Sequence, residues 1–73
     1  MKTGYWQPEY TKFLKKLVQA RKDAGLTQVE VAARLNKHQS FITKSEKGER
    51  RVDIIELKRF AKIYKKPLDY FVE

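Results

Sequence analysis

The 73-residue sequence contains no cysteine, three glycines and two prolines. Without cysteine, no disulfide can stabilise a chain whose length is near the lower limit for a self-sufficient hydrophobic core. The scarcity of glycine and proline, together with many Lys, Leu, Ala and Glu residues, favours helices throughout. We therefore expect a single all-α domain whose stability comes from packed helices.

Long apolar runs are also missing. No stretch approaches the roughly 20 consecutive apolar residues that a membrane-spanning helix needs, and no signal peptide is recognisable. Together with the lack of cysteine, these features predict a soluble, cytoplasmic protein without a membrane partner.

Residues suited to catalysis or metal binding are equally scarce. His38 is the only histidine, and no cysteine or cluster of carboxylates accompanies it, so a metal site is not expected. No nucleophile–base pair, glycine-rich phosphate loop or pair of catalytic carboxylates can be identified. The sequence predicts a protein that is not an enzyme and needs no cofactor.

Charge, in contrast, is abundant and mostly of one sign. The formal net charge is +8, and the excess lies in residues 1–51, because residues 52–73 carry five basic and four acidic side chains. Such an excess indicates a polyanionic partner, most commonly nucleic acid. The alternative is that the charge only maintains solubility. A membrane surface is less favoured, since the basic residues are not confined to one amphipathic helix.

Residues 27–48 have the pattern of two short helices joined by a tight turn. Thr27 is a suitable N-cap for the first, and Asn36 tolerates the left-handed conformation that a helix end requires. The second helix is predicted from about residue 39 to 47, with Gly48 as its C-terminal stop. The apolar residues of the first helix that share one face are Val31, Ala32 and Leu35.

The predicted second helix has two chemically distinct faces. Amide, hydroxyl and ammonium groups share an arc of roughly 140°, without a carboxylate, and can contact base edges and phosphates. The residues of this arc are Gln39, Ser40, Thr43, Lys44 and Lys47, and those of the opposite side are Phe41, Ile42 and Ser45. Glu46 lies at the border and requires a cation if it is buried. An ordinary solvated helix face is the alternative interpretation of this arc.

This segment resembles the helix-turn-helix of the Cro/C1-type (XRE-like) family of prokaryotic DNA-binding regulators, whose phage repressors are well-known examples. The matching residues are Gly25-Leu26-Thr27-Gln28, Ala32, Gln39-Ser40-Phe41-Ile42 and Glu46-Lys47-Gly48-Glu49-Arg50. The similarity extends from about Phe13 to Phe71.

Three positions depart from the family pattern. Asn36 replaces a usual glycine, and His38 replaces a usual Ser or Thr N-cap and should cap less well. Ser45 replaces a usual large apolar residue and leaves core volume that Trp6 or Tyr10 could fill.

The remaining sequence predicts three further helices, giving a five-helix bundle of the phage-repressor type. Residues 1–8 form a short arm, and residues 9–73 form the DNA-binding domain. The first helix is expected to end at Gly25 and the fifth to begin near Pro67. The fourth is predicted from Ile54 to about Tyr64, with a capping box formed by Asp53 and Glu56. The predicted core residues are Phe13, Leu14, Leu17, Val18, Arg21 and Ala24 in the first helix and Ile54, Leu57, Phe60, Ala61 and Tyr64 in the fourth.

The resemblance implies roles for individual residues. Gln28 would contact a phosphate and steady Gln39, and Gln39 would read adenine through its amide. An ion pair between Arg21 and Glu46 is expected to be mostly buried. The predicted DNA-binding residues are Gln28, Lys37, His38, Gln39, Ser40, Thr43, Lys44, Lys47, Arg50 and Arg51. Among these, Ser40, Thr43 and Lys44 are further base-edge candidates, and Lys37, Lys47, Arg50 and Arg51 suit phosphates.

The sequence thus predicts a sequence-specific double-stranded DNA-binding protein, a small transcriptional regulator that acts as a homodimer on a palindromic operator. Leu68, Tyr70, Phe71 and Val72 are too many apolar residues for one short terminal helix to bury, so part of them is expected to form the dimer contact. Two alternatives stay open. One is an antitoxin-type protein-interaction module that binds a toxin, and the other is the DNA-binding head of a longer regulator with a sensing domain.

Overall fold

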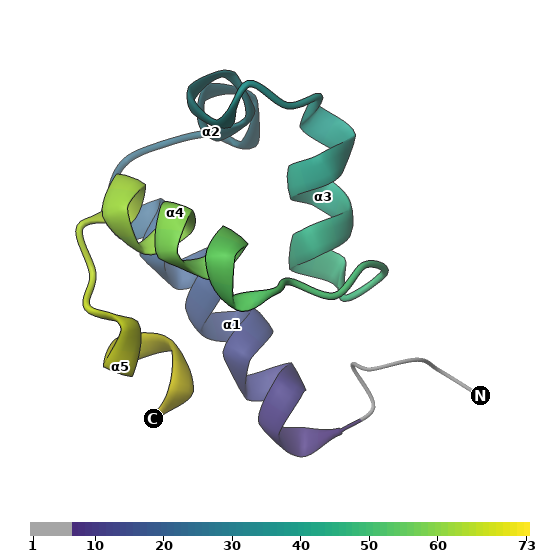
Figure 1. The fold of residues 1–73 in the computed structure, drawn as a ribbon, viewed down its shortest axis with the longest axis vertical. Coiled ribbons are helices and arrows are strands. Elements are labelled where there is room, and N and C mark those ends of the chain that lie inside the picture. The colour runs from purple at the N-terminus through teal and green to yellow at the C-terminus, as the bar shows by residue number, and fades with distance from the viewer. Residues whose placement is uncertain (1–6) are drawn as a thin grey trace.

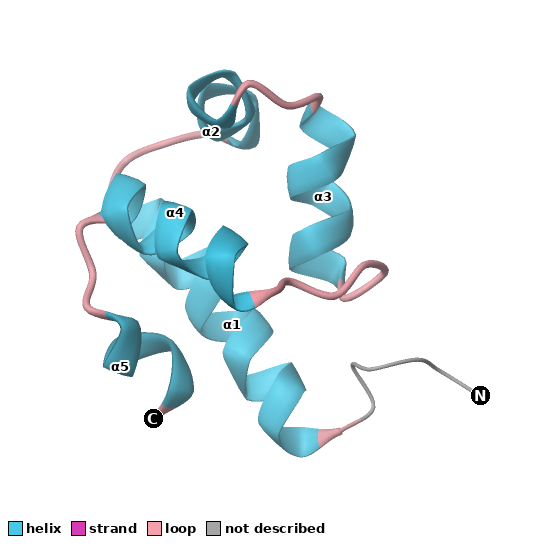
Figure 2. Ribbon diagram, in the orientation of Figure 1, coloured by secondary structure: helices cyan, strands magenta, loops and turns pink. Residues whose placement is uncertain are grey.

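The computed structural model describes residues 7–73, which contain five helices joined by short loops (Figures 1 and 2). Their bounds are α1 (Pro8–Asp23), α2 (Gln28–Leu35), α3 (Gln39–Lys47), α4 (Ile54–Tyr64) and α5 (Leu68–Val72). The all-α, five-helix prediction is confirmed, with the helix-turn-helix in α2 and α3. Of the predicted N-terminal arm, Tyr5 and Trp6 lie outside the described residues.

Capping boxes begin α2 and α4. The Thr27 hydroxyl accepts from the Glu30 N–H (3.1 Å), and the Glu30 carboxylate accepts from the Thr27 N–H (2.8 Å). Asp53 and Glu56 make the same reciprocal pair, at 2.7 and 3.1 Å. These bonds satisfy backbone donors that the first helical turn leaves free, and they fix where both helices start. The box at Asp53 is the predicted one, whereas at Thr27 only the cap was predicted.

Residues in the left-handed conformation end α2, α3 and α4. Asn36 has φ 58° after α2, Gly48 has φ 80° after α3, and Lys65 has φ 59° after α4. Asn and Gly suit this conformation. His38 is the N-cap of α3, where its Nδ1 accepts from the Ser40 N–H at 3.2 Å. The turn predicted at residues 36–38 is therefore present, and the imidazole replaces the usual hydroxyl cap.

The hydrophobic core lies between α1, α4 and the helix pair. α1 contacts α3, α4 and α5, and α2 packs mainly on α3. The ring of Phe60 stacks on both Phe41 and Tyr64, and Phe13 meets Phe71 edge-on. The fully buried large side chains are Leu17, Val31, Ile42, Phe60 and Phe71. In the described part of the chain, no helix has the length and apolar character needed to cross a bilayer.

Two predicted core residues are exposed instead. Ala24 is the C-cap of α1 rather than part of its apolar stripe, and Ala20, one turn earlier, is buried in its place. Ile54 is 60% exposed, because the first turn of α4 projects past the core while Leu57 and Phe60 point into it. The 3.6-residue period is present in both helices, but the buried face of α1 and that of α4 are each one residue shorter than predicted.

Candidate nucleic-acid interface

The polar arc of α3 faces away from the core. Gln39, Ser40, Lys44 and Lys47 are exposed, and Thr43 is half-buried. The other face of α3 buries Ile42 and Ser45 completely. The described surface of α3 therefore presents amides, hydroxyls and ammonium groups together, as its sequence predicts.

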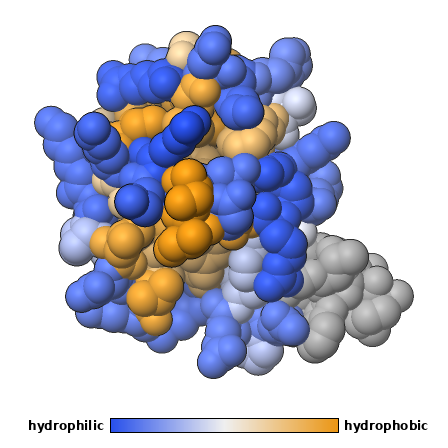
Figure 3. Space-filling view, in the orientation of Figure 1, coloured by the Kyte–Doolittle hydropathy of each residue, from blue (hydrophilic) through white to orange (hydrophobic). Residues whose placement is uncertain are grey.

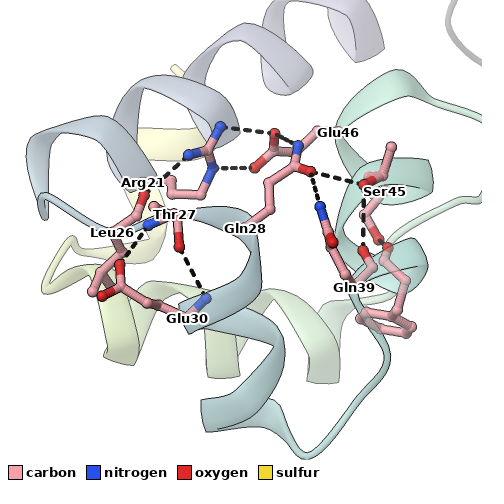
Figure 4. Close-up of polar contacts among 10 residues, drawn as sticks. Arg21, Leu26, Thr27, Gln28, Glu30, Gln39, Ser45 and Glu46 are labelled. Carbon is pink, nitrogen blue, oxygen red and sulfur yellow. Dashed lines mark hydrogen bonds and ion pairs between the residues drawn. The ribbon is translucent and has the colours of Figure 1, made fainter.

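Gln28, the first residue of α2, is tied to this arc. Its Oε1 accepts a hydrogen bond from Gln39 Nε2 at 3.4 Å (Figure 4). The same oxygen accepts from the Thr43 hydroxyl at 2.7 Å. Thr43 also lies 3.3 Å from the Gln39 carbonyl. The two glutamines thus lie against each other as the resemblance implies, and their contacts with DNA stay predictions.

A polar chain continues from Gln28 to α1. Gln28 Nε2 donates to Glu46 Oε1 at 2.9 Å, and Glu46 accepts from Arg21 through Nε at 2.7 Å and Nη2 at 3.2 Å. Arg21 Nη1 also donates to the carbonyl of Leu26 at 3.0 Å (Figure 4). The side chains of Arg21 and Glu46 are 14% and 6% exposed, so the predicted ion pair is present and mostly buried. Hydrogen bonding to Glu46 raises the pKa of Arg21.

The remaining basic residues surround α3 in different ways. Lys37 Nζ lies 5.3 Å from the centroid of the Phe41 ring, and Arg51 lies over the Tyr10 ring at 4.3 Å. The exposed His38, besides capping α3, lies 3.2 Å from the Ser40 hydroxyl. Lys37, His38 and Arg51 are all exposed, so their charged or polar groups lie at the surface.

Arg50 differs from its neighbours, because its guanidinium is engaged within the protein. It forms a bidentate pair with Glu56, at 3.0 and 2.8 Å, and its Nη1 donates to the Ser45 hydroxyl at 3.2 Å. Arg50 therefore packs next to the small Ser45 side chain, where the sequence predicted Trp6 or Tyr10 to fill the core. Tyr10 instead accepts from the Val52 N–H at 3.1 Å, and Trp6 lies outside the described residues. Sequence periodicity gives no signal for the Arg50–Glu56 pair, because a loop separates the two residues.

Comparison with known proteins agrees with this geometry. The sequence profile of the helix-turn-helix family of the XRE/Cro/C1 type matches residues 17–71, most of the chain. No curated protein matches the chain.

Proposed function

This chain belongs to the Cro/C1-type helix-turn-helix family of DNA-binding regulators, and on that premise we propose that it binds double-stranded DNA sequence-specifically as a homodimer on a palindromic operator. The recognition helix α3 enters the major groove, and α2 crosses the DNA backbone. The protein thereby regulates transcription at that operator.

The observation that carries this proposal is the prearranged Gln28–Gln39 pair. Gln28 donates one amide hydrogen to Glu46, and its Oε1 accepts from Gln39 and Thr43 of α3. The second amide hydrogen of Gln28 is therefore available for a phosphate. Gln39 uses one amide hydrogen on Gln28. Its other hydrogen and its Oε1 are available for adenine N7 and N6, the pair of groups that an amide matches.

Thr43 has a narrower role than its hydroxyl first suggests. Its hydrogen is donated to Gln28 at 2.7 Å, so towards a base the oxygen can only accept. Thr43 is therefore suited to a donor such as the cytosine or adenine amino group, or through its methyl group to thymine. Ser40 and Lys44 are the other base-edge residues in our proposal, and the phosphate contacts come from Lys37, His38, Lys47 and Arg51.

An apolar surface over α4 and α5 supports the homodimer. Phe71 is buried in its own bundle, but Val72 remains 73% exposed, and Leu68, Ile54 and Ile55 are also exposed. Figure 3 shows apolar side chains gathered on the face where α4 and α5 lie. Exposed apolar surface of this kind is typical of protein interaction sites, and a two-fold contact would place two α3 helices about one DNA turn apart.

Selection of duplexes from a random pool at moderate salt tests the DNA-binding proposal. Gln39→Ala should cost about 1–3 kcal/mol, concentrated at one base pair per half-site, while the salt dependence stays nearly unchanged. Arg51→Ala is the matched comparison, and it should weaken all sequences about equally and lower the slope of log affinity against log salt by about 1. A flatter salt slope for Gln39→Ala, with unchanged base preference, would contradict the assigned reading face.

Sedimentation at micromolar concentration, with and without the selected DNA, tests the dimer. Val72→Lys should shift the protein towards monomer and weaken binding to the two-half-site operator. Gln19→Lys is a suitable control, because Gln19 is exposed on α1, outside this apolar surface, and the substitution adds the same charge. A monomer bound to a single, non-repeated site would exclude the homodimer.

A second candidate is a protein-interaction module, such as an antitoxin that binds a toxin. The observation that favours it is a groove of about 610 Å³ between α1, α4 and α5, whose lining includes Phe13, Ile54 and Val72. In that case the groove, and not α3, carries the main function. Failure of the duplex selection, together with a monomeric protein, would favour this candidate.

A further inference from the structure

Arg50 is the first basic residue after α3, and its guanidinium joins two helices. Towards α4 it pairs with both carboxylate oxygens of Glu56. Towards α3 it donates to the Ser45 hydroxyl, and its Cζ lies 4.2 Å from the centroid of the Phe41 ring. The side chain therefore bridges the buried side of the recognition helix and the first turn of α4.

Each partner of Arg50 is itself held in place. Glu56 also accepts from the Asp53 N–H in the cap of α4. The Ser45 hydroxyl donates to the Phe41 carbonyl at 2.7 Å, and the Phe41 ring stacks on Phe60 in the core. A planar guanidinium with several donors fits this arrangement, and an ammonium group does not, because it is compact and cannot pair in the same bidentate manner.

Ser45 makes room for this contact. A large apolar side chain at this fully buried position would compete with the guanidinium for space. Ser45 is fully buried, and its hydroxyl both donates to Phe41 and accepts from Arg50. The small residue and the inward arginine therefore form one packing unit.

Arg51 provides the contrast. It is exposed, lies on the face of the Tyr10 ring and makes no ion pair among residues 7–73. Its charge is free to meet a phosphate. Three of the five N–H donors of Arg50 are engaged by Glu56 and Ser45, and the Glu56 carboxylate already balances its charge, so a phosphate gains less attraction from Arg50 than from Arg51.

We propose that Arg50 is a positioning residue, which sets the recognition helix against α4 through Ser45 and Glu56 and contributes no phosphate contact. This inference rests on the proposed DNA-binding function, and it replaces the phosphate role that the sequence predicted for Arg50. Arg50 then affects affinity through the orientation of α3, whereas Arg51 affects it through charge.

Charge-conserving substitutions separate the two roles in the full chain. Arg50→Lys keeps the charge but loses the bidentate pair, so it should weaken operator binding by about fivefold or more, as much as Arg50→Met. Neither variant should change the salt slope. At the control position, Arg51→Lys should bind like the wild type, and Arg51→Met should lower the slope by about 1. If Arg50→Lys binds like the wild type and Arg50→Met lowers the slope, the proposal is wrong.

A double-mutant cycle tests whether Arg50 acts through Glu56. Glu56→Asp also keeps the charge and should lower affinity, and Arg50→Lys in that background should cost little more. Additive losses would show that Arg50 acts independently of Glu56, which contradicts the proposal. Because Arg50→Lys, Glu56→Asp and the double variant retain the net charge, any difference in their affinities reflects geometry rather than the overall field.

Amide hydrogen exchange in the absence of DNA tests the positioning role of Arg50 independently of the proposed DNA binding. Arg50→Lys should speed exchange in the last turn of α3 and the first turn of α4, and Arg51→Lys should not. If the wild type binds no duplex but this difference is seen, the proposed function fails and the positioning role stands. If exchange is unchanged while the wild type binds DNA, the positioning role fails alone.

Discussion

Two arginine–glutamate pairs hold the recognition helix, and they share one chemistry in different surroundings. The Arg21–Glu46 pair has side chains 14% and 6% exposed and connects α1 to α3. The Arg50–Glu56 pair is 30% and 23% exposed and connects the end of α3 to the start of α4. Both are bidentate, although Arg21 pairs through Nε and Nη2 and Arg50 through Nη1 and Nη2.

The two pairs should contribute unequally to stability, because they differ in burial. Removing one partner from a buried pair leaves a charge that water cannot reach, whereas a partly exposed charge is re-solvated. The inner pair also continues through Gln28 to Gln39, so its loss should disturb both stability and the reading face. The outer pair ends at Ser45 and the cap of α4, so its loss should act mainly on the orientation of α3.

Breaking the inner pair should have the largest effect. Glu46→Ala strands the Arg21 guanidinium, and the expected loss of unfolding free energy is about 3–5 kcal/mol, a large part of the stability of a small domain. Chemical denaturation measures it. The double variant Arg21→Met with Glu46→Leu should lose less than Glu46→Ala, because it leaves no stranded charge. An unchanged midpoint for Glu46→Ala would mean that the pair contributes nothing.

Breaking the outer pair should cost less. Glu56→Gln removes the charge opposite Arg50, and we expect a loss of about 1–2 kcal/mol, because the hydrogen bonds are to a charged group but the site is partly solvated. Denaturation beside Glu46→Ala makes the comparison direct. Equal losses for the two variants would show that burial does not separate the pairs.

The same pair predicts a pH dependence. Hydrogen bonding to Arg50 lowers the pKa of Glu56 below its unfolded value. The ionised Glu56 therefore contributes fully to the free energy of unfolding at neutral pH. This contribution is lost as the pH falls from about 5 through the folded pKa, because the unfolded state binds the proton first. Denaturation midpoints from pH 7 to 3 should fall less steeply for Glu56→Gln than for the wild type. Parallel curves would contradict this assignment.

A helix cap distant from the outer pair should have a smaller effect. Thr27→Ala removes one half of the capping box of α2, at an expected cost of about 1 kcal/mol. Thermal or chemical denaturation measures this loss, and Thr27→Ser is the control that keeps the hydroxyl. A loss as large as that of Glu46→Ala would mean that the cap supports the ion-pair network as well as the helix.

The smallest effect is expected at Tyr64, whose charged neighbours are those of the inner pair. Its buried hydroxyl has no hydrogen-bond partner among the described residues, and burial, followed by the charge of Glu46, raises its pKa. Tyr64→Phe removes this group without removing the ring, so stability should change by less than about 0.5 kcal/mol or increase. A loss above about 1 kcal/mol would show that the hydroxyl takes part in the network around Glu46.

Local features of this protein follow from short stretches of its sequence. The turn at residues 36–38 predicted the start of α3, Gly48 predicted its end, and Asp53 predicted the start of α4. These predictions are confirmed, because a cap depends only on residues within one helical turn. The buried stripes followed from the 3.6-residue period. The Arg21–Glu46 pair was predicted as well, but only through the resemblance to a known family, since 25 residues separate the two partners.

The arrangement of the helices decided the rest. Ile54 has the same apolar character as Leu57, and only the position of α4 against α1 leaves one exposed and the other buried. Arg50 and Arg51 are identical neighbours in the sequence, yet the loop turns one towards Glu56 and the other onto Tyr10. No periodicity distinguishes adjacent loop residues, because their partners are brought near by the packing of separate helices and not by the geometry of either helix.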